Sequence, residues 1–402
     1  MKIVVTHPHG NINTIKVISL FQKLKFLDSF CTTISFPIKF FFNKKSFSKI
    51  SLKKMKIFFL KELFRLIFNF FHLKNLYFYE NSFFSVNSVY KDLDLKVAKY
   101  LKKNAQNINV IYSYEDCSLN SFQFAKNNRI KTIYDLTSPY WRLKEKILNE
   151  EIKLQTEWNL SSTEINSKQK CLNKDKEIFL SDQIVVASTF AAKSLELYNK
   201  KKLKIEIIPY GSPTSVNSFT NVRKINDKLK IIFAGRPLLS KGFPYIIDSL
   251  NSIDLPWELE IAGSIPEKPE LISKKLFFFL KDPRCKFLGQ ISNDKLLQRM
   301  RNSHIFLFPS LYEGFGQVLL EAMSCGLPVI TTENTGGPDF IKDCDNGFIT
   351  KIRDTKKTKD ILNNLYKNEE LRCLISKKAI DTAAKLNWTG YNNKIKDMLL
   401  KI

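Results

Sequence analysis

Residues 308–323 read FPSLYEGFGQVLLEAM, and this stretch decides the fold class of the chain. The apolar run that ends at Phe308 is typical of a strand, and Gly314 and Gly316 then interrupt the chain before a helical pattern begins. A helix N-terminus carries unpaired N–H groups with partial positive charge, which at the carboxyl edge of a parallel sheet face an open crevice. The stretch therefore predicts a phosphate-binding turn between a strand and a helix.

Two glutamates flank this turn. Glu313 stands at the entrance of the predicted helix, and Glu321 follows about two helical turns later. Gly314 and Gly316 allow the backbone to come close to a ligand. Two separate carboxylates beside a phosphate site suit the hydroxyl groups of a nucleotide-sugar. The alternative is that both glutamates are solvated side chains of an ordinary helix.

A second turn of similar composition precedes the first. Residues 233–242 read FAGRPLLSKG and end a predicted strand at 229–234. Arg236 and Lys241 place two cations in this turn, close behind Gly235. By itself this is an unremarkable basic turn, but a partner turn at 308–323 predicts that both cations face the same anion.

Short apolar runs alternate with helical patterns along both halves of the chain, and this alternation predicts parallel sheets. A chain of 402 residues is long enough for two cores, because single cores stop growing at about 250–300 residues. Residues 212–228 are polar and lack periodicity, as in an interdomain connection. We predict strands at 2–6, 110–113, 131–135, 183–187 and 205–208, then at 229–234, 258–262, 286–288, 305–308, 329–332 and 347–349.

The first predicted helix follows the loop at residues 7–11, and its apolar positions run from Val17 to Leu27 at helical spacing. Residues 36–84 break the alternation, since they are dense in Phe, Ile and Leu interleaved with Lys. A basic, aromatic helix suits the boundary of a membrane. From Ile57 to Leu73 the apolar residues nearly encircle the predicted helix, which suits packing inside the N-terminal domain equally well.

These motifs together resemble the family-4 retaining glycosyltransferases (glycosyl transferases group 1). The resemblance rests on the Glu-x7-Glu spacing of 313–321, on the Gly-Arg-x4-Lys-Gly pattern of 235–242 and on the Cys-Gly-Leu-Pro-Val stretch at 325–329. It implies an α/β GT-B fold, with two Rossmann-like domains that face a central cleft. We expect an acceptor-binding domain at 1–210, a nucleotide-sugar-binding domain at 211–385, and a helix at 386–402 that returns to the first domain.

The resemblance also implies roles for residues of the donor site. It assigns Glu313 to hydroxyls of the donor sugar and Glu321 to the ribose. Arg236 and Lys241 would neutralise the diphosphate and stabilise the charge that develops as the sugar–phosphate bond breaks. The backbone of the second domain would complete the donor site at Gly235, Gly314, Phe315 and Gly316, and at Gln290 and Ile291 beside the base.

Acceptor residues are expected at the opposite edge of the cleft. Gly10 and His9 lie in the loop after the first strand, and Glu115 and Asp116 follow the strand at 110–113. Many family members carry a histidine near this second position, so either carboxylate is expected to substitute for it as a hydrogen-bond acceptor. Residues 134–141, YDLTSPYW, form an aromatic loop that suits either sugar stacking or the core.

The function that the resemblance implies is transfer of a hexosyl unit from a nucleoside diphosphate sugar to a hydroxyl, with retention of configuration. We expect a glycan or lipid-linked acceptor and a role in cell-surface polysaccharide or lipid-linked glycan synthesis. No cofactor, metal or nucleic acid is expected. The protein is expected in the cytoplasm, with contact to the inner face of the membrane through residues 36–84 as one interpretation.

The net charge of +25 supports a competing interpretation. A field of that sign attracts anionic polymers and membrane surfaces, so a non-catalytic cationic GT-B protein would also fit the composition. Codon bias toward Lys, Asn, Ile and Phe is a further explanation for the charge. A purely electrostatic protein would not need Glu313, Glu321, Arg236 and Lys241 together.

Overall fold

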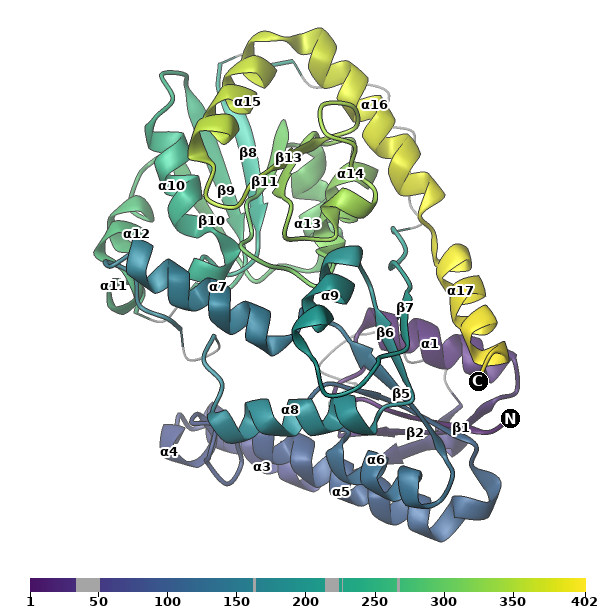
Figure 1. The fold of residues 1–402 in the computed structure, drawn as a ribbon. Helices are drawn as coiled ribbons and strands as arrows, with labels where there is room; N and C mark the ends of the chain where they lie inside the picture. Colours follow the sequence, from purple (N-terminus) through teal and green to yellow (C-terminus); the bar gives the residue numbers. More distant parts are fainter. Residues whose placement is uncertain (34–50, 162–163, 214–223, 226, 266–267) are drawn as a thin grey trace.

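The computed structural model describes residues 1–33, 51–161, 164–213, 224–225, 227–265 and 268–402. In these residues the chain forms two parallel β-sheets, each with helices packed on it (Figure 1). Strands alternate with helices in both halves, which confirms the predicted α/β class with two Rossmann-like domains.

The N-terminal sheet has seven strands in the order β3-β2-β1-β4-β5-β6-β7. Helices α3, α5, α6 and α8 lie side by side along one face, and α1 lies on the other (Figure 1). The strands are β1 (Ile3–Thr6), β2 (Leu27–Thr32), β3 (Met55–Ile57), β4 (Val110–Tyr114), β5 (Lys131–Leu136), β6 (Gln183–Val186) and β7 (Ile205–Ile207). The helices are α1 (Ile12–Lys23), α3 (Leu60–Phe70), α4 (Lys74–Tyr77), α5 (Val86–Asn104), α6 (Leu119–Asn127), α7 (Trp141–Leu154), α8 (Lys168–Leu180) and α9 (Thr189–Ser194).

The C-terminal sheet has the order β10-β9-β8-β11-β12-β13. The order reverses between β8 and β11, and in open parallel sheets such a switch point opens a crevice at the carboxyl edge. The strands are β8 (Leu229–Ala234), β9 (Trp257–Ala262), β10 (Cys285–Gly289), β11 (Ile305–Phe308), β12 (Val329–Thr332) and β13 (Phe348–Thr350). The helices are α10 (Phe243–Asn251), α11 (Pro269–Ile272), α12 (Lys274–Phe279), α13 (Asn293–Arg301), α14 (Gln317–Ser324), α15 (Thr355–Lys367), α16 (Glu369–Lys385) and α17 (Trp388–Leu400).

Two sequence predictions near the N-terminus were wrong. The first helix ends at Lys23 rather than reaching Leu27, because Lys25 adopts a left-handed conformation with φ of 59° and the chain then enters β2. The helix expected from Ile57 begins only at Leu60. Residues 55–57 instead form β3 on the edge of the sheet, paired in parallel with β2.

The chain passes between the domains twice. It crosses first after β7, at Tyr210–Gly211, and returns just before α17, which packs on α1 of the N-terminal domain. The two crossings touch, since the Ser212 N–H donates to the carbonyl of Leu386 at 2.7 Å. A Cβ on Gly211 would lie 2.5 Å from the nitrogen of Trp388, so the contact requires glycine. The boundaries at residues 210 and 385 stay predictions and lie beside these crossings.

A buried carboxyl group lies near these crossings. The Tyr112 hydroxyl donates to Asp135 Oδ2 at 2.7 Å, and both residues are fully buried in adjacent strands β4 and β5. Three further buried tyrosines lie close enough to interact electrostatically with Asp135, namely Tyr114 of β4, Tyr210 of the first crossing and Tyr391 of α17. Burial raises the pKa of Asp135 to about 7.

In the segment 36–84, helix α3 packs on the N-terminal domain, while many apolar side chains of the segment are exposed to solvent. Its residues 36–50 lie outside the part of the chain that the structure describes. Helix α3 packs against α5 and buries Glu62, which accepts two 2.7 Å hydrogen bonds from Arg65. The outer surface of residues 59–83 exposes large apolar side chains, and we call this surface the aromatic face. It comprises Phe59, Leu60, Phe64, Ile67, Phe70, Phe71, Leu73, Leu76, Phe78, Tyr79 and Phe83.

None of the helices in the described ranges combines the length and the apolar character that a bilayer span requires.

Candidate functional site

Two helices begin with left-handed glycines at the carboxyl edge of the C-terminal sheet. Gly242, with φ of 65°, precedes α10, and Gly316, with φ of 77°, precedes α14. The turns that contain them follow β8 and β11, which are neighbours in the sheet. Both predicted turns therefore lie at the switch point, where helix N-termini favour a bound anion.

The structure joins the two turns through an ion pair. Lys241 Nζ contacts Glu313 Oε2, and about a quarter of each side chain is exposed to solvent, 27% for Lys241 and 26% for Glu313. The Leu311 N–H donates to the carbonyl of Ser240 at 2.9 Å, which fixes the turns against each other. A cation and a carboxylate expected to act on the same substrate are therefore in direct contact at one edge.

Arg236 lies two residues beyond the end of β8, half-buried and five residues before Lys241. The backbone here is tightly packed, because a Cβ on Gly263 would lie 2.1 Å from the carbonyl oxygen of Gly235. The ends of β8 and β9 therefore meet backbone to backbone. Gly235 itself has φ of 147°, a conformation that other residues rarely adopt.

Glu321 is held by a residue that the sequence analysis did not identify. Asn293 Nδ2, in the first turn of α13, donates to Glu321 Oε1 at 2.8 Å. Burial raises the pKa of Glu321, and the hydrogen bond from Asn293 opposes this increase. Gln290 and Ile291 immediately precede α13, exposed and half-buried respectively. A signal for Asn293 was present in Ser292, which caps α13 and thus places Asn293 at the helix start.

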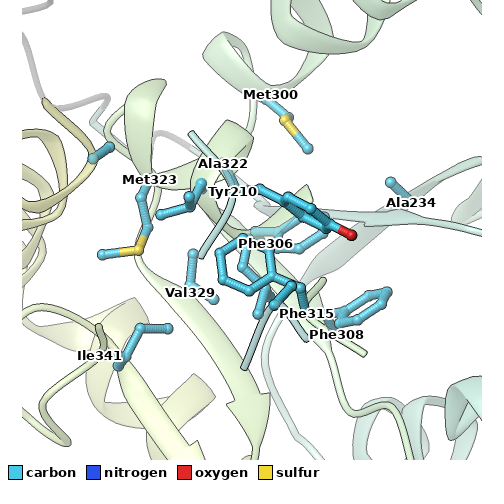
Figure 2. Close-up of a cluster of buried hydrophobic side chains, with 14 of the residues drawn as sticks. Tyr210, Ala234, Met300, Phe306, Phe308, Phe315, Ala322, Met323, Val329 and Ile341 are labelled. Atoms are coloured by element: carbon cyan, nitrogen blue, oxygen red, sulfur yellow. The ribbon is translucent and has the colours of Figure 1, made fainter. Parts of the chain in front are cut away.

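Phe315 points into the core rather than toward a ligand. Its ring packs against Tyr210 and Phe340, with ring centroids 5.3 and 5.5 Å apart, and its exposed fraction is 2%. Figure 2 shows Phe315 in a cluster of buried side chains that includes Tyr210. Any contact of Phe315 with a donor must therefore come from its backbone. The ring instead anchors the glycine turn to the first interdomain crossing at Tyr210.

Gly314 contacts the N-terminal domain. A Cβ at this position would lie 2.0 Å from the carbonyl oxygen of Thr137, and Ser188 Oγ donates to the carbonyl of Gly314 at 2.5 Å. Next to Ser188, the Thr189 N–H donates to Asp339 Oδ2 at 2.7 Å. The N-terminal domain therefore closes directly onto the Glu-x7-Glu turn, and sequence patterns within one domain gave no signal for these contacts.

A pocket of about 340 Å³ lies between the domains beside the Lys241–Glu313 pair. Residues of α7 line one side of it and Tyr312 with Glu313 line the other. The volume is in the range of small-ligand sites. Trp141 lines this pocket although it is almost fully buried, and Tyr140 beside it is a core residue. Both side chains donate to Asp175 Oδ1, so these two aromatics serve mainly the core.

Glu115 and Asp116 are half-buried and form ion pairs with the buried Lys174 and the half-buried Lys170. Lys174 Nζ is 3.1 Å from Glu115 and 3.6 Å from Asp116, and Lys170 Nζ is 3.3 Å from Asp116. Burial opposes ionisation of Glu115, but Lys174 and then Lys144 hold its pKa at about 2. Both carboxylates thus already form ion pairs with lysines, and their role as hydrogen-bond acceptors for a substrate hydroxyl stays a prediction.

The loop at His9 and Gly10 wraps around His7. The N–H groups of His9 and Gly10 donate to His7 Nδ1 at 3.1 and 2.8 Å. Burial, with the neighbouring His9, lowers the pKa of His7 to about 3, so the ring stays neutral and accepts these bonds. His9 lies 4.0 Å from Glu62 of α3. The loop that follows β1 therefore contacts α3, the helix that carries part of the aromatic face.

Comparison with known proteins gives one family match. Residues 217–382 match the family described as "Glycosyl transferases group 1". Among curated relatives, the capsular polysaccharide biosynthesis glycosyltransferase CapM of Staphylococcus aureus is 26% identical over 48% of this chain and 53% of the relative. The amylovoran biosynthesis glycosyltransferase AmsD of Erwinia amylovora is 28% identical over 48% and 52%. The chain thus spans about half the length of these relatives.

Solved structures match over the whole chain. HepE of Anabaena, crystallised with UDP, has a TM-score of 0.67 at 16% identity and covers 100% of both chains. Sucrose-phosphate synthase of Thermosynechococcus elongatus has a TM-score of 0.69 at 14% identity over 100% of this chain and 98% of that one. At these identities the similarity establishes the fold, which is the GT-B arrangement predicted from the motifs.

Proposed function

We propose that this chain, whose residues 217–382 carry the glycosyl transferases group 1 signature, transfers a hexosyl unit from a nucleoside diphosphate sugar to a hydroxyl acceptor. The observation that carries the proposal is the contact between Lys241 and Glu313 at the switch point. Two helix N-termini and a lysine gather positive charge there, and a carboxylate stands beside them to accept hydrogen bonds from sugar hydroxyls. The relatives named above act in polysaccharide biosynthesis, which supports a glycan product.

In this proposal the diphosphate lies over the starts of α10 and α14. Arg236 and Lys241 stabilise the charge that grows on the leaving phosphate, and this electrostatic role replaces a metal ion. Glu313 orients the donor sugar and Glu321, held by Asn293, binds the ribose. The anomeric configuration is retained, with the leaving phosphate helping to deprotonate the acceptor hydroxyl on the same face of the sugar.

The test is nucleotide-dependent thermal stabilisation with UDP, GDP, ADP and their sugars. A ligand at about 100 times its dissociation constant adds about 2.7 kcal/mol to the folded state. Glu321→Ala and Arg236→Ala should each abolish the stabilisation while the protein remains folded. Glu196→Ala removes an exposed carboxylate of the N-terminal domain and is the matched control, which should respond like the parent protein. Stabilisation that survives both site substitutions would contradict the proposed donor site.

The competing function is a non-catalytic cationic protein that binds an anionic polymer or a membrane, and the net charge of +25 favours it. It predicts no stabilisation by any nucleotide and binding that is lost at high salt. The same thermal panel therefore separates the two functions.

We further propose that the aromatic face contacts an anionic membrane surface on the cytoplasmic side. Phe70, Phe71 and Phe83 are 77%, 64% and 70% exposed. Large exposed apolar patches of this kind mark protein or membrane contact sites. Lysines border it, since Lys61 Nζ lies 4.7 Å from the ring centroid of Phe83 and Lys74 Nζ lies 5.9 Å from that of Phe78. Aromatic side chains with a lysine rim suit the headgroup boundary.

Flotation with vesicles tests this contact. The protein should float with vesicles that contain phosphatidylglycerol and float less at high salt. Phe70→Ser with Phe71→Ser should weaken flotation, whereas Phe278→Ser, which removes an equally exposed phenylalanine (67%) on α12, should not. Equal flotation of the double variant and the control would refute the aromatic face as the contact.

A further inference from the structure

Helix α7 lies along the boundary between the two domains and is fixed to both of them (Figure 1). At its start, Trp141 Nε1 donates to Asp175 Oδ1 of α8 in the N-terminal domain at 2.7 Å. Shortly after its end, the Asn159 N–H donates to the carbonyl of Ile272 in α11 of the C-terminal domain at 2.7 Å. The helix therefore links the domains in addition to the two chain crossings.

The second half of α7 carries a buried carboxylate that the C-terminal domain holds. Glu151 has an exposed fraction of 0%. Its Oε1 accepts a hydrogen bond from the Tyr245 hydroxyl, and its Oε2 accepts one from Arg353 Nε at 2.7 Å. Burial raises the pKa of Tyr245, so its hydroxyl stays protonated and donates. Both oxygens of this carboxylate are thus bound by side chains of the other domain.

Arg353 has a backbone conformation that indicates a specific contact. Its φ is 71°, in the left-handed region that residues other than glycine rarely adopt, and it lies between β13 and α15. Such strain, like a buried carboxylate, lowers stability unless the surrounding contacts compensate. A charge-assisted hydrogen bond restricts the geometry of its partners more than apolar packing does. The Arg353–Glu151 pair therefore sets the orientation of α7 on the C-terminal domain.

The residues that α7 contacts lie beside the two turns of the candidate donor site. Tyr245 is in the first turn of α10, directly after the turn that carries Lys241. Ile147 of α7 forms a buried apolar cluster with Tyr245 and Leu311. Leu311 lies two residues before Glu313. Helix α7 therefore packs against both turns, next to the residues that form their ion pair.

We propose that Glu151 is a positioning residue of the donor site. By fixing α7 to Tyr245 and Arg353, it holds the two turns in the arrangement that binds a nucleoside diphosphate. The inference rests on the proposed transferase function and adds a residue that acts through others without touching substrate. Because a coupling free energy is reciprocal, a donor that binds more tightly when α7 is docked must itself stabilise the docked helix.

The first experiment measures the dissociation constant of UDP by titration calorimetry, at a temperature at which circular dichroism shows each variant folded. Glu151→Ala should weaken UDP binding about five- to tenfold, a typical size for coupling between two sites. The control Glu150→Ala removes the neighbouring carboxylate, whose side chain is 47% exposed and 3.3 Å from Arg353, and should bind UDP as the parent protein does. A residue that served stability alone would lower the melting temperature without changing the dissociation constant.

A milder substitution tests the same contact from the C-terminal domain. Tyr245→Phe removes only the hydroxyl that donates to Glu151 and should also weaken UDP binding. In the Glu151→Ala background the same substitution should have no further effect, because the hydroxyl has already lost its acceptor. Additive effects of the two substitutions would mean that Tyr245 acts on UDP independently of Glu151, which would overturn the inference.

Hydrogen exchange followed by mass spectrometry measures the reciprocal effect. Saturating UDP should slow the exchange of the α7 amides in the parent protein and should do so less in Tyr245→Phe and Glu151→Ala. Amides of α6, on the N-terminal sheet, should exchange alike with and without UDP. Unchanged dissociation constants in both variants, or equal protection of α7 in the variants and the parent protein, would overturn the inference and leave the donor site intact. If UDP, GDP and ADP all fail to bind the parent protein, the proposed function is contradicted and the inference falls with it.

Discussion

Replacing the buried Asp135 with asparagine should change how the stability of the protein depends on pH. Asp135 lies in β5 near the two interdomain crossings, and its surroundings are tyrosines. The Tyr112 hydroxyl donates to it at 2.7 Å, and Tyr114, Tyr210 and Tyr391 complete the shell. Asparagine keeps the shape and one hydrogen-bond acceptor but removes the ionisable group.

The size of the effect follows from the pKa of Asp135. Burial raises it from 3.8 to about 7, so between these values the folded protein keeps a proton that the unfolded chain has lost. The stabilising contribution is complete below pH 3.8 and is lost as the pH rises through 7. At 1.36 kcal/mol per pH unit the whole interval corresponds to about 4 kcal/mol, of which about 2.5 kcal/mol is lost between pH 5 and 8.

Urea unfolding of the parent protein and Asp135→Asn at pH 5 and pH 8 measures this contribution. The free energy of unfolding of Asp135→Asn, relative to the parent protein, should increase by about 2.5 kcal/mol from pH 5 to pH 8. The control Asp254→Asn replaces an exposed carboxylate. Its free energy of unfolding should differ from that of the parent protein by the same amount at pH 5 and pH 8. A difference for Asp135→Asn that is constant within about 0.5 kcal/mol would refute the reasoning, because it would mean that Asp135 ionises alike in the folded and unfolded states.

Three further substitutions test other contacts. Gly314→Ala places a Cβ 2.0 Å from the Thr137 carbonyl oxygen and should lower the free energy of unfolding by about 1–3 kcal/mol. The control Gly390→Ala lies in α17, where the new Cβ would meet only a side-chain atom at 3.9 Å, and should be neutral or stabilise by up to about 1 kcal/mol. Equal effects of the two substitutions in thermal unfolding would contradict the close approach of Gly314 to Thr137. Asn293→Ala removes a hydrogen bond that opposes the raised pKa of Glu321, so Glu321 should take up a proton at a higher pH in this variant. In fluorescence titrations at decreasing pH, the affinity for UDP should therefore begin to fall at a higher pH than in the parent protein. An unchanged pH profile would show that Asn293 does not act on UDP binding through Glu321. Lys174→Met leaves Glu115 without its closest cation and should cost about 3–5 kcal/mol in urea unfolding. A loss below about 1 kcal/mol would show that the neighbouring lysines compensate.

Most strands of the two sheets, although not β2 or β3, were predictable because buried parallel strands are short apolar runs. The prediction 305–308 agrees with β11 and 229–234 with β8, since such runs are bounded by polar residues. The edge strand β3 was missed because its sequence, Met-Lys-Ile, alternates over only three residues and continues into helical spacing. Edge strands bury less apolar area and therefore leave a weaker sequence signal.

The two glycine turns were predictable because each lies within one short stretch. Helix capping, a left-handed glycine and the adjacent charged residue are all local, so Lys241 and Glu313 are each recognisable before their contact is known. The acceptor side was less predictable. Glu115 and Asp116 were expected to face substrate, but their charges are bound by Lys170 and Lys174 from a helix more than fifty residues later.

By itself, the sequence determined the α/β class, the two alternating halves and the identity of the turns at the switch point. It could do so because helix period, strand length, glycine and capping residues act over a few positions. Only the tertiary structure decided that Phe315 packs against Tyr210, that Gly314 meets Thr137, and that Lys144 faces the pocket. These relations depend on how two separately folded sheets approach each other, and burial and charge balance at such an interface are set by residues far apart in the chain.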